Sequence, residues 1–208
     1  SIHILCKLGN CAGIFTSDMN MINTIIKINN DLFDDINIID FCVGSIKTKQ
    51  LFREFCQPFN GSNNYDNSEL IHYNGVDYVL KKGGIIFISL RLGYDMLEPE
   101  YYKVIPLLFS KFRNNIGIIG GIKKRAYYFI GINGENKLIF VDPHYPQETK
   151  DNCDEYYETY NTKNFYLLDI KDMRSQFSLG IGIFGSRHFN EFLEDAKWFS
   201  NNYKNVID

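Results

Sequence analysis

Apolar residues recur along this chain at two different spacings, which change from helical to strand-like near its middle. Spacings of three and four residues predict a helix over 18–29, for which Ser17 or Asp18 is the expected cap. A run of apolar residues predicts a strand over 36–43, and a second helix is expected over 45–57. The first part of the chain is therefore expected to place a strand between two helices.

The middle of the chain alternates polar and apolar segments. Asn, Ser and Gly crowd residues 58–74, which predicts a long polar loop. Residues 76–80 fit either a short helix or an extended segment, and the apolar run 85–91 predicts a buried strand. Helical spacing resumes after Pro99, because proline is favoured in the first turn of a helix.

Strand signals dominate the remainder of the chain. Short apolar runs are separated by turn residues, and Asn133-Gly134 is typical of a tight hairpin turn. A closing helix is expected after Ser186, where apolar residues again follow helical spacing. This order of elements predicts an α+β fold, with a largely antiparallel sheet and flanking helices. The strands are expected over 116–119, 126–132, 137–142, 165–169 and 179–184.

Composition narrows the class of protein. The 208 residues are 45% hydrophobic and 23% charged, which is ordinary for one folded domain. No apolar run reaches the roughly 18 residues that a membrane-spanning helix needs. No basic region precedes an apolar segment at the start, so we expect no secretory signal and a cytoplasmic location. A net charge of −3 gives no reason to expect nucleic acid as a partner.

The cysteines favour neither disulfides nor a metal site. Their number is odd, their spacings are irregular, and no C-x-x-C pair occurs. We therefore expect no structural zinc, no cofactor, and reduced thiols. The five are Cys6, Cys11, Cys42, Cys56 and Cys153, of which Cys42 and Cys56 lie in apolar surroundings and are expected in the core.

One short motif carries recognisable chemistry. An apolar strand ends in Asp142-Pro143-His144, and residues two apart on a strand point to the same face, with Cα atoms roughly 6.5 Å apart. A carboxylate beside an imidazole fixes the tautomer of the ring and stabilises its protonated form, as a catalytic pair requires. Taken alone, these three residues fit a surface pair or a structural histidine more simply.

The residues around this motif resemble those of a known family. Between GIIGG at 117–121 and LIFVDPHYPQ at 138–147, the sequence closely resembles the autophagin family, the autophagy-related cysteine proteases with a papain-like core. The resemblance implies one papain-like protease domain over residues 1–208, in which Asp142 and His144 are two members of the catalytic triad. Other stretches that resemble the family are 1–13, 88–102, 127–131 and 178–199, the first of them weakly.

The turn between two of these stretches departs from the family. Gly120-Gly121 precede the basic residues 123–125, where the family has a loop that covers the active-site cleft. The two glycines are expected to act as a hinge for such a loop. The basic residues fit a solvated turn equally well.

The nucleophile of the family has no counterpart in this sequence. In the family it stands in a G-W-G-C-M-R-like motif, so the resemblance implies that the nucleophile lies upstream of Ser1 and that these residues alone are inactive. Two cysteines within the chain are alternatives: Cys11 is flanked by glycines but does not open a helix, and Cys153 is near His144 in sequence only. We expect every cysteine here to lie too far from His144 to attack a substrate.

Two functions follow, and they differ in turnover. The first is a cysteine endopeptidase, for which the resemblance implies cleavage after a C-terminal glycine of a ubiquitin-like autophagy modifier. It also implies release of that modifier from lipid, so that a membrane is met only through the lipidated substrate. The second is a non-catalytic pseudo-protease that binds the same ubiquitin-like partner. The intact D-P-H-x-x-Q signature, which ends at Gln147, favours the enzyme.

Overall fold

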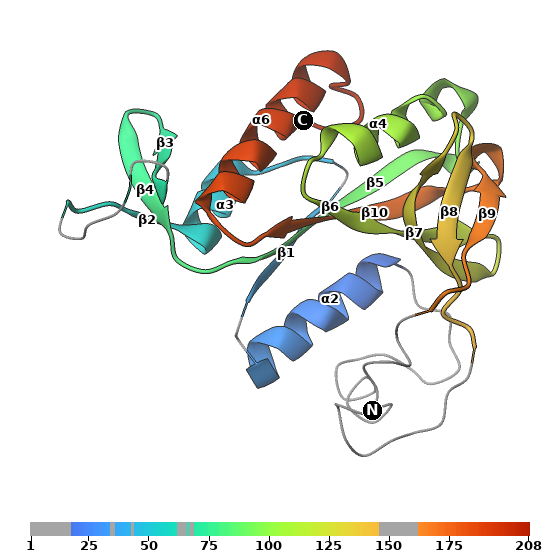
Figure 1. The fold of residues 1–208 in the computed structure, drawn as a ribbon, viewed down its shortest axis with the longest axis horizontal. Helices are drawn as coiled ribbons and strands as arrows, with labels where there is room; N and C mark the ends of the chain where they lie inside the picture. Colours follow the sequence, from blue (N-terminus) through green and yellow to red (C-terminus); the bar gives the residue numbers. More distant parts are fainter. Residues whose placement is uncertain (1–17, 34–35, 43, 62–65, 67–68, 146–161) are drawn as a thin grey trace.

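A seven-stranded sheet forms the centre of the protein, and helices lie on both of its faces (Figure 1). The structure is a computed structural model that describes residues 18–33, 36–42, 44–61, 66, 69–145 and 162–208. The strand order is β1-β5-β10-β6-β7-β8-β9. The strands are β1 (Asn37–Cys42), β5 (Gly84–Met96), β6 (Asn115–Ile122), β7 (Arg125–Asn133), β8 (Lys137–Val141), β9 (Tyr166–Asp169) and β10 (Arg174–Ile183).

The pairing of the strands confirms the expected fold class. β1 runs parallel to β5, and every other neighbouring pair in this sheet is antiparallel. β10 comes last in sequence yet lies between β5 and β6, near the middle of the sheet. The protein is therefore an α+β fold with a mostly antiparallel sheet and flanking helices, as the order of elements predicts.

Three helices cover the first face of the sheet: α3 (Thr48–Phe55), α4 (Val104–Lys111) and α6 (Ser186–Asn202). The main hydrophobic core lies between them and the sheet. Stacked aromatic rings link α6 to the end of α4, where the ring centroids of Phe112 and Phe199 are 4.9 Å apart. The helix expected after Pro99 is divided into a 3₁₀ turn, η3 (Pro99–Tyr101), and α4.

A single described helix, α2 (Asp18–Ile28), packs on the second face and continues as a π-helical turn, η1 (Asn29–Phe33). Ile22 on this helix is fully buried against Ile38 of β1 and Phe87 of β5. Burial of these side chains supplies the main attraction between α2 and the sheet. The other short helix described, η4 (Ile170–Asp172), joins β9 to β10.

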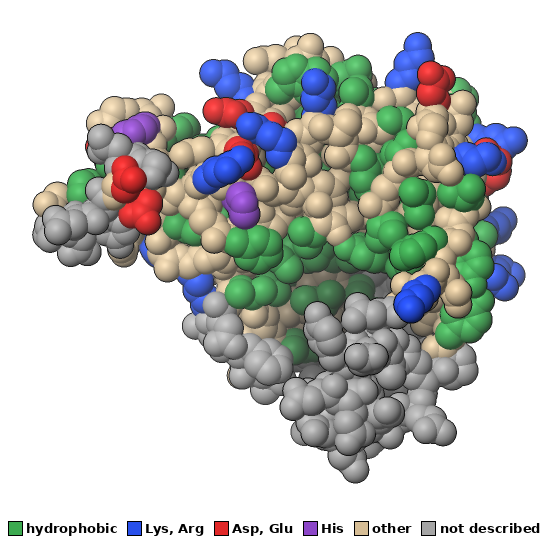
Figure 2. All heavy atoms as spheres, viewed as in Figure 1, with side chains coloured by type: hydrophobic (Ala, Val, Ile, Leu, Met, Phe, Trp, Pro, Cys, Tyr) green, Lys and Arg blue, Asp and Glu red, His purple; other side chains and the backbone are tan. Residues whose placement is uncertain are grey.

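Beyond α2, the second face exposes large apolar side chains. We call this region the open face and define it by Ile116, Tyr128, Leu167 and Phe184, whose exposed fractions lie between 36% and 66%. Ile116 reaches this face because a bulge shifts the register of β6 against β10, so that its side chain lies over Gly180. Hydrophobic side chains gather on this side of the molecule in Figure 2.

A second, smaller sheet stands beside α3 and α6. It contains β2 (Cys56–Pro58), β4 (Val76–Leu80) and β3 (Ile71–Tyr73), in that order. The Phe52 ring of α3 stacks on Tyr73, with ring centroids 4.4 Å apart. This sheet corrects two expectations: part of the polar segment 58–74 forms a strand, and α3 ends at Phe55 because the next residues pair with β4.

No helix among the described residues combines the length and apolar character that crossing a membrane requires.

Candidate active site

Asp142 and His144 lie together just beyond the end of β8. The apolar residues of this strand are held between β7 and β9. The strand ends at Val141, one residue earlier than expected, and Asp142 begins a turn. The Oδ1 atom of Asp142 accepts hydrogen bonds from the backbone N–H of His144, at 3.0 Å, and from its ring Nδ1.

The turn replaces the strand geometry that the sequence suggests. An aspartate carboxylate that accepts a backbone hydrogen bond two residues ahead forms an Asx turn, which brings the two side chains closer than the pleat of a strand does. Pro143 suits such a turn, because its ring fixes φ near −65° and it has no N–H to satisfy. The carboxylate and the imidazole are in contact, as expected, but for this local reason.

The surroundings shield the carboxylate more than the ring. The Asp142 side chain is 15% exposed, whereas that of His144 is 49% exposed. The ring of Tyr127 meets the His144 ring edge-on, with centroids 6.2 Å apart, and Tyr127 is itself held against Phe140. One side of the imidazole is thereby fixed, while about half of the side chain stays open to solvent.

The charge on Asp142 is favoured by its neighbours. Partial burial alone would raise the pKa of Asp142, but the two hydrogen bonds from His144 and the charge of Arg125 outweigh this effect. The pKa of Asp142 therefore lies below its usual range, and the group is ionised at neutral pH. An ionised carboxylate on Nδ1 leaves Nε2 as the ring atom that exchanges protons with other groups.

The two cysteines in the described part of the chain do not reach this pair. Cys42 is exposed at the end of β1, and not in the core as expected. β1 is separated from β8 by four intervening strands and thus by roughly 24 Å. Cys56 is buried in the main core, and this burial raises the pKa of its thiol to about 12. Neither thiol fits the role of a nucleophile activated by His144.

Several residues named from the sequence lie outside the described residues. They are Cys6, Cys11, Gln147 and Cys153.

The turn beside the pair corrects another expectation. Gly120 and Gly121 lie inside β6 and pair with β7, so they are not a hinge in a loop. A Cβ atom on Gly121 would stand 2.0 Å from the carbonyl oxygen of Arg125, so glycine is required there for close packing of the two strands. The turn itself is short, and Lys124 adopts a left-handed backbone conformation with a φ of +69°.

Two contributors to the site escape sequence reasoning. Tyr127 and Arg125 come from the neighbouring strand, and both influence the Asp142–His144 pair. The alternation of β7 predicts that Tyr127 faces the core, but not that its ring borders His144. Within the described residues, no group of three or more His, Cys, Asp or Glu side chains is arranged to bind a metal ion.

A family model and individual relatives match this chain. The model, described as the peptidase C54 catalytic domain, matches residues 1–195. A "Probable cysteine protease ATG4" of Debaryomyces hansenii is 32% identical over 117 residues, which are 56% of this chain and 23% of that protein. The "Cysteine protease atg4" of Dictyostelium discoideum is 37% identical over 108 residues, which are 49% of this chain and 14% of that protein.

A third relative shows the same partial overlap. The "Cysteine protease ATG4" of Candida albicans is 42% identical over 89 residues, or 41% of this chain and 19% of that protein. The matched residues thus span less than a quarter of the length of each of these three relatives.

Proposed function

The chain belongs to the peptidase C54 family, the autophagins, and from this premise we propose that it is part of a cysteine endopeptidase in which His144 transfers the proton and Asp142 orients its ring. The observation that carries the proposal is the hydrogen-bonded contact between the two side chains at an accessible strand end. His144 is then a general base whose Nδ1 is held by Asp142 and whose Nε2 is left to exchange a proton with a thiol.

The reaction needs a thiol nucleophile, and His144 acts as its general base and general acid in two steps. In the first step, Nε2 of His144 takes the thiol proton, and the sulfur attacks the carbonyl carbon of the scissile bond. The imidazolium then gives this proton to the leaving amine, and a thioester remains. In the second step, Nε2 takes a proton from water, the hydroxide attacks the thioester, and the proton returns to the departing sulfur. Asp142 stabilises the imidazolium throughout.

We infer that the thiol comes from polypeptide outside these 208 residues. Of the two cysteines that the structure describes, Cys42 is too distant from His144, and Cys56 is buried and protonated. The G-W-G-C-M-R-like motif that holds the nucleophile in the family does not occur in the 208 residues. The open face supports this inference, because exposed apolar surface of this kind is typical of an interface. This face lies on the side of the sheet opposite Tyr127, the neighbour of His144, and comes nearest to the pair at the strand end, where Tyr128 pairs with Val141, the residue before Asp142. Residues 1–208 would then be one papain-like domain that a nucleophile-bearing segment completes.

The proposed substrate is a ubiquitin-like autophagy modifier, cleaved after a glycine near its C-terminus. The family relationship supports this substrate, and the names of the relatives support the thiol protease activity. Release of the modifier from lipid is the same bond cleavage with a lipid amine as leaving group. The protein would act in the cytoplasm and meet a membrane only through its lipidated substrate, with no cofactor.

The test measures turnover of a modifier precursor that carries residues beyond its terminal glycine. The full-length protein is expected to cleave it, and His144→Gln is expected to lower kcat by about 10³-fold or more. His72→Gln is the matched control, because His72 also contacts a carboxylate, that of Asp77 at 2.6 Å, but lies in the small sheet. Equal turnover in wild type and His144→Gln would refute the proposed role.

The same assay separates the enzyme from the pseudo-protease. Tight binding of the modifier by the full-length protein, with no cleavage under any condition, would identify a binding module. Cleavage that survives loss of the imidazole would instead place the catalytic base elsewhere in the protein.

A further inference from the structure

β1 is an edge strand of the large sheet, and within the described residues its outer backbone groups have no strand partner. Asn37 donates its N–H to the carbonyl of Gly83 on the β5 side, at 2.9 Å. Because alternate residues of a strand turn their backbone groups to opposite sides, those of Ile38 and Asp40 point away from β5. No backbone hydrogen bond from another described residue reaches them. Exposed edges of this kind are templates for another strand.

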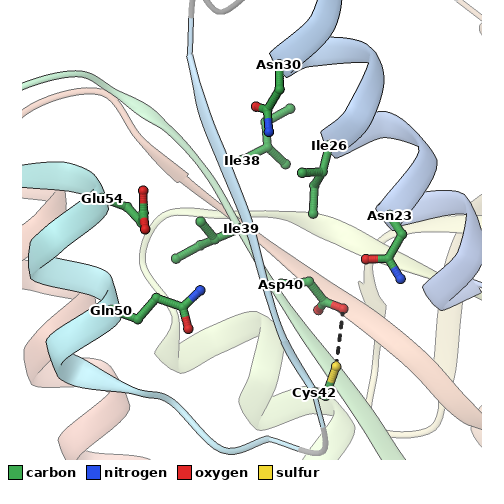
Figure 3. A pocket seen from close by; sticks show the side chains of 9 residues that line it. All are labelled: Asn23, Ile26, Asn30, Ile38, Ile39, Asp40, Cys42, Gln50 and Glu54. Carbon is green, nitrogen blue, oxygen red and sulfur yellow. Dashed lines mark hydrogen bonds between the residues drawn. The ribbon is translucent and has the colours of Figure 1, made fainter.

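This edge lies at the bottom of a groove between two helices (Figure 3). The groove has a volume of about 310 Å³. Asn23 lines it from α2, Asn30 from η1, and Gln50 and Glu54 from α3. Most of these side chains end in amides, which donate and accept hydrogen bonds and tolerate a polar backbone beside them.

The charge in this groove is negative. Among its lining residues, the acids are Asp40 and Glu54, and none is a lysine or arginine. Glu54 is already paired with Arg53 at 2.8 Å. Asp40 accepts a hydrogen bond from the Ser89 hydroxyl at 2.9 Å and contacts the Cys42 thiol at 3.8 Å, but no cation pairs with it among the described residues. A half-buried carboxylate in this position favours an incoming positive charge.

We propose that the groove along β1 binds an extended segment of a partner protein, which adds a strand to β1 and places a lysine or arginine against Asp40. The segment would gain affinity from the outward-facing backbone groups of Ile38 and Asp40, and specificity from alternate side chains. Its basic residue and the residues two positions away would face α2. There, Ile26 and Ile38 offer apolar contacts to the flanking positions.

A second copy of this chain is a poor occupant. β1 is recessed between α2 and α3 in every copy, so the rims of two grooves would collide before two β1 strands could pair. Antiparallel pairing around the middle of β1 would also bring two Asp40 carboxylates close together, and like charges across strands are destabilising.

The experiment measures binding of a fluorescent peptide, acetyl-Thr-Val-Thr-Lys-Thr-Val-Thr-amide, to the full-length protein by fluorescence anisotropy. In an extended strand its Val and Lys residues share one face, as the groove requires. We expect saturable binding and slower hydrogen exchange of residues 37–42 in the complex. The peptide with Glu in place of Lys should bind about tenfold more weakly.

Two variants test the charge and one pair of peptides tests the strand. Asp40→Asn keeps an acceptor for the Ser89 hydroxyl and should lower the affinity for the Lys peptide about fivefold. Asp77→Asn, which lies outside the groove, should leave this affinity unchanged. Two methylated peptides are compared, one with N-methyl groups on the Val and Lys amides and one with N-methyl groups on the Thr amides. Only one of the two should lose binding, because only alternate amides of an extended peptide face β1.

Three outcomes would overturn the proposal. They are absence of saturable binding, equal affinity for the Lys and Glu peptides, and equal effects of the two N-methylated sets. Binding to the 208 residues that is lost in the full-length protein would also overturn it, because a segment of the same protein would then occupy the groove.

Discussion

At the scale of single residues, the Asp142–His144 pair shows how a local motif can determine the geometry of a site. Both hydrogen bonds join residues two positions apart, so the three residues of the motif largely determine how the two side chains meet. This is why the contact could be predicted from sequence. Tyr127 could not be placed beside it in this way, because its position depends on the pairing of β7 with β8.

The lowered pKa of Asp142 has a consequence for stability. A carboxyl group whose pKa is lower in the folded state stabilises the fold above its unfolded pKa, and this contribution is lost as pH falls through the folded value. Asp142→Asn should therefore reduce the free energy of unfolding by about 1 kcal/mol at pH 6–8. Chemical denaturation at a series of pH values should show that the difference in free energy of unfolding between the wild type and this variant shrinks below roughly pH 4. A difference that grows on acidification would contradict this assignment.

Gly121 offers a second residue-scale prediction. Gly121→Ala should destabilise the protein by about 2 kcal/mol or more, because the added Cβ would collide with the carbonyl of Arg125. Gly131→Ala on the next strand is the control, since its Cβ would meet no atom closer than 3.9 Å. Thermal unfolding of the two variants distinguishes close packing from a hinge, which would tolerate alanine at Gly121 as well as at Gly131.

At the scale of elements, α6 is held by polar contacts to the turn that joins α4 to β6, as well as by its apolar side chains. Asp195 on this helix accepts a hydrogen bond from the backbone N–H of Arg113 at 3.0 Å and from its guanidinium at 2.8 Å. The carboxylate is nearly buried, at 9% exposure. These contacts also raise the pKa of Arg113, so the guanidinium stays charged.

Removing this connection should loosen the helix. Asp195→Ala should lower the free energy of unfolding by about 2 kcal/mol, because the Arg113 N–H and guanidinium both lose a nearly buried carboxylate partner. Arg187→Ala breaks an exposed pair with Glu191 on the same helix and should cost less than about 0.5 kcal/mol. Urea denaturation of both variants tests the contrast, and similar losses would show that burial does not decide the effect.

Element boundaries were hardest to predict where polar residues are buried. The apolar pattern predicts the last strand over 179–184, but β10 begins at Arg174. The hydroxyl of Ser178 is fully buried and lies 2.9 Å from that of Ser89 on β5. A hydrophobic pattern cannot detect such a strand position, because two hydroxyl groups satisfy each other only when distant segments meet.

At the scale of the whole molecule, the open face is the feature with the clearest consequence in solution. Its apolar side chains extend from Phe184 beside β10 to Leu167 on β9, an edge strand. The 208 residues alone should therefore self-associate, and Leu167→Lys with Phe184→Lys should reduce this association. Sedimentation velocity measures the change. A monomeric wild-type chain at high concentration would argue against an unfilled interface.

The topology of the sheet also lies beyond sequence reasoning. The local signals identify most strands and the hairpin between β7 and β8, because those contacts are close in sequence. The insertion of β10 between β5 and β6 joins residues 59 to 99 positions apart, and no local pattern encodes it. Long-range pairing of this kind is set by the packing of the whole chain.

The position of β10 also has a consequence for synthesis of the protein on the ribosome. The centre of the sheet is translated after both of its flanks, so β1 with β5 and β6 through β9 emerge as two separate groups of strands. At a translation rate of roughly 5–20 residues per second, about 4 to 17 seconds pass between completion of β5 and of β10. Until β10 is complete, the edge of β5, and that of β6 once it has been translated, lack their partner. The nascent chain should therefore depend on chaperones until its final strand and α6 leave the exit tunnel.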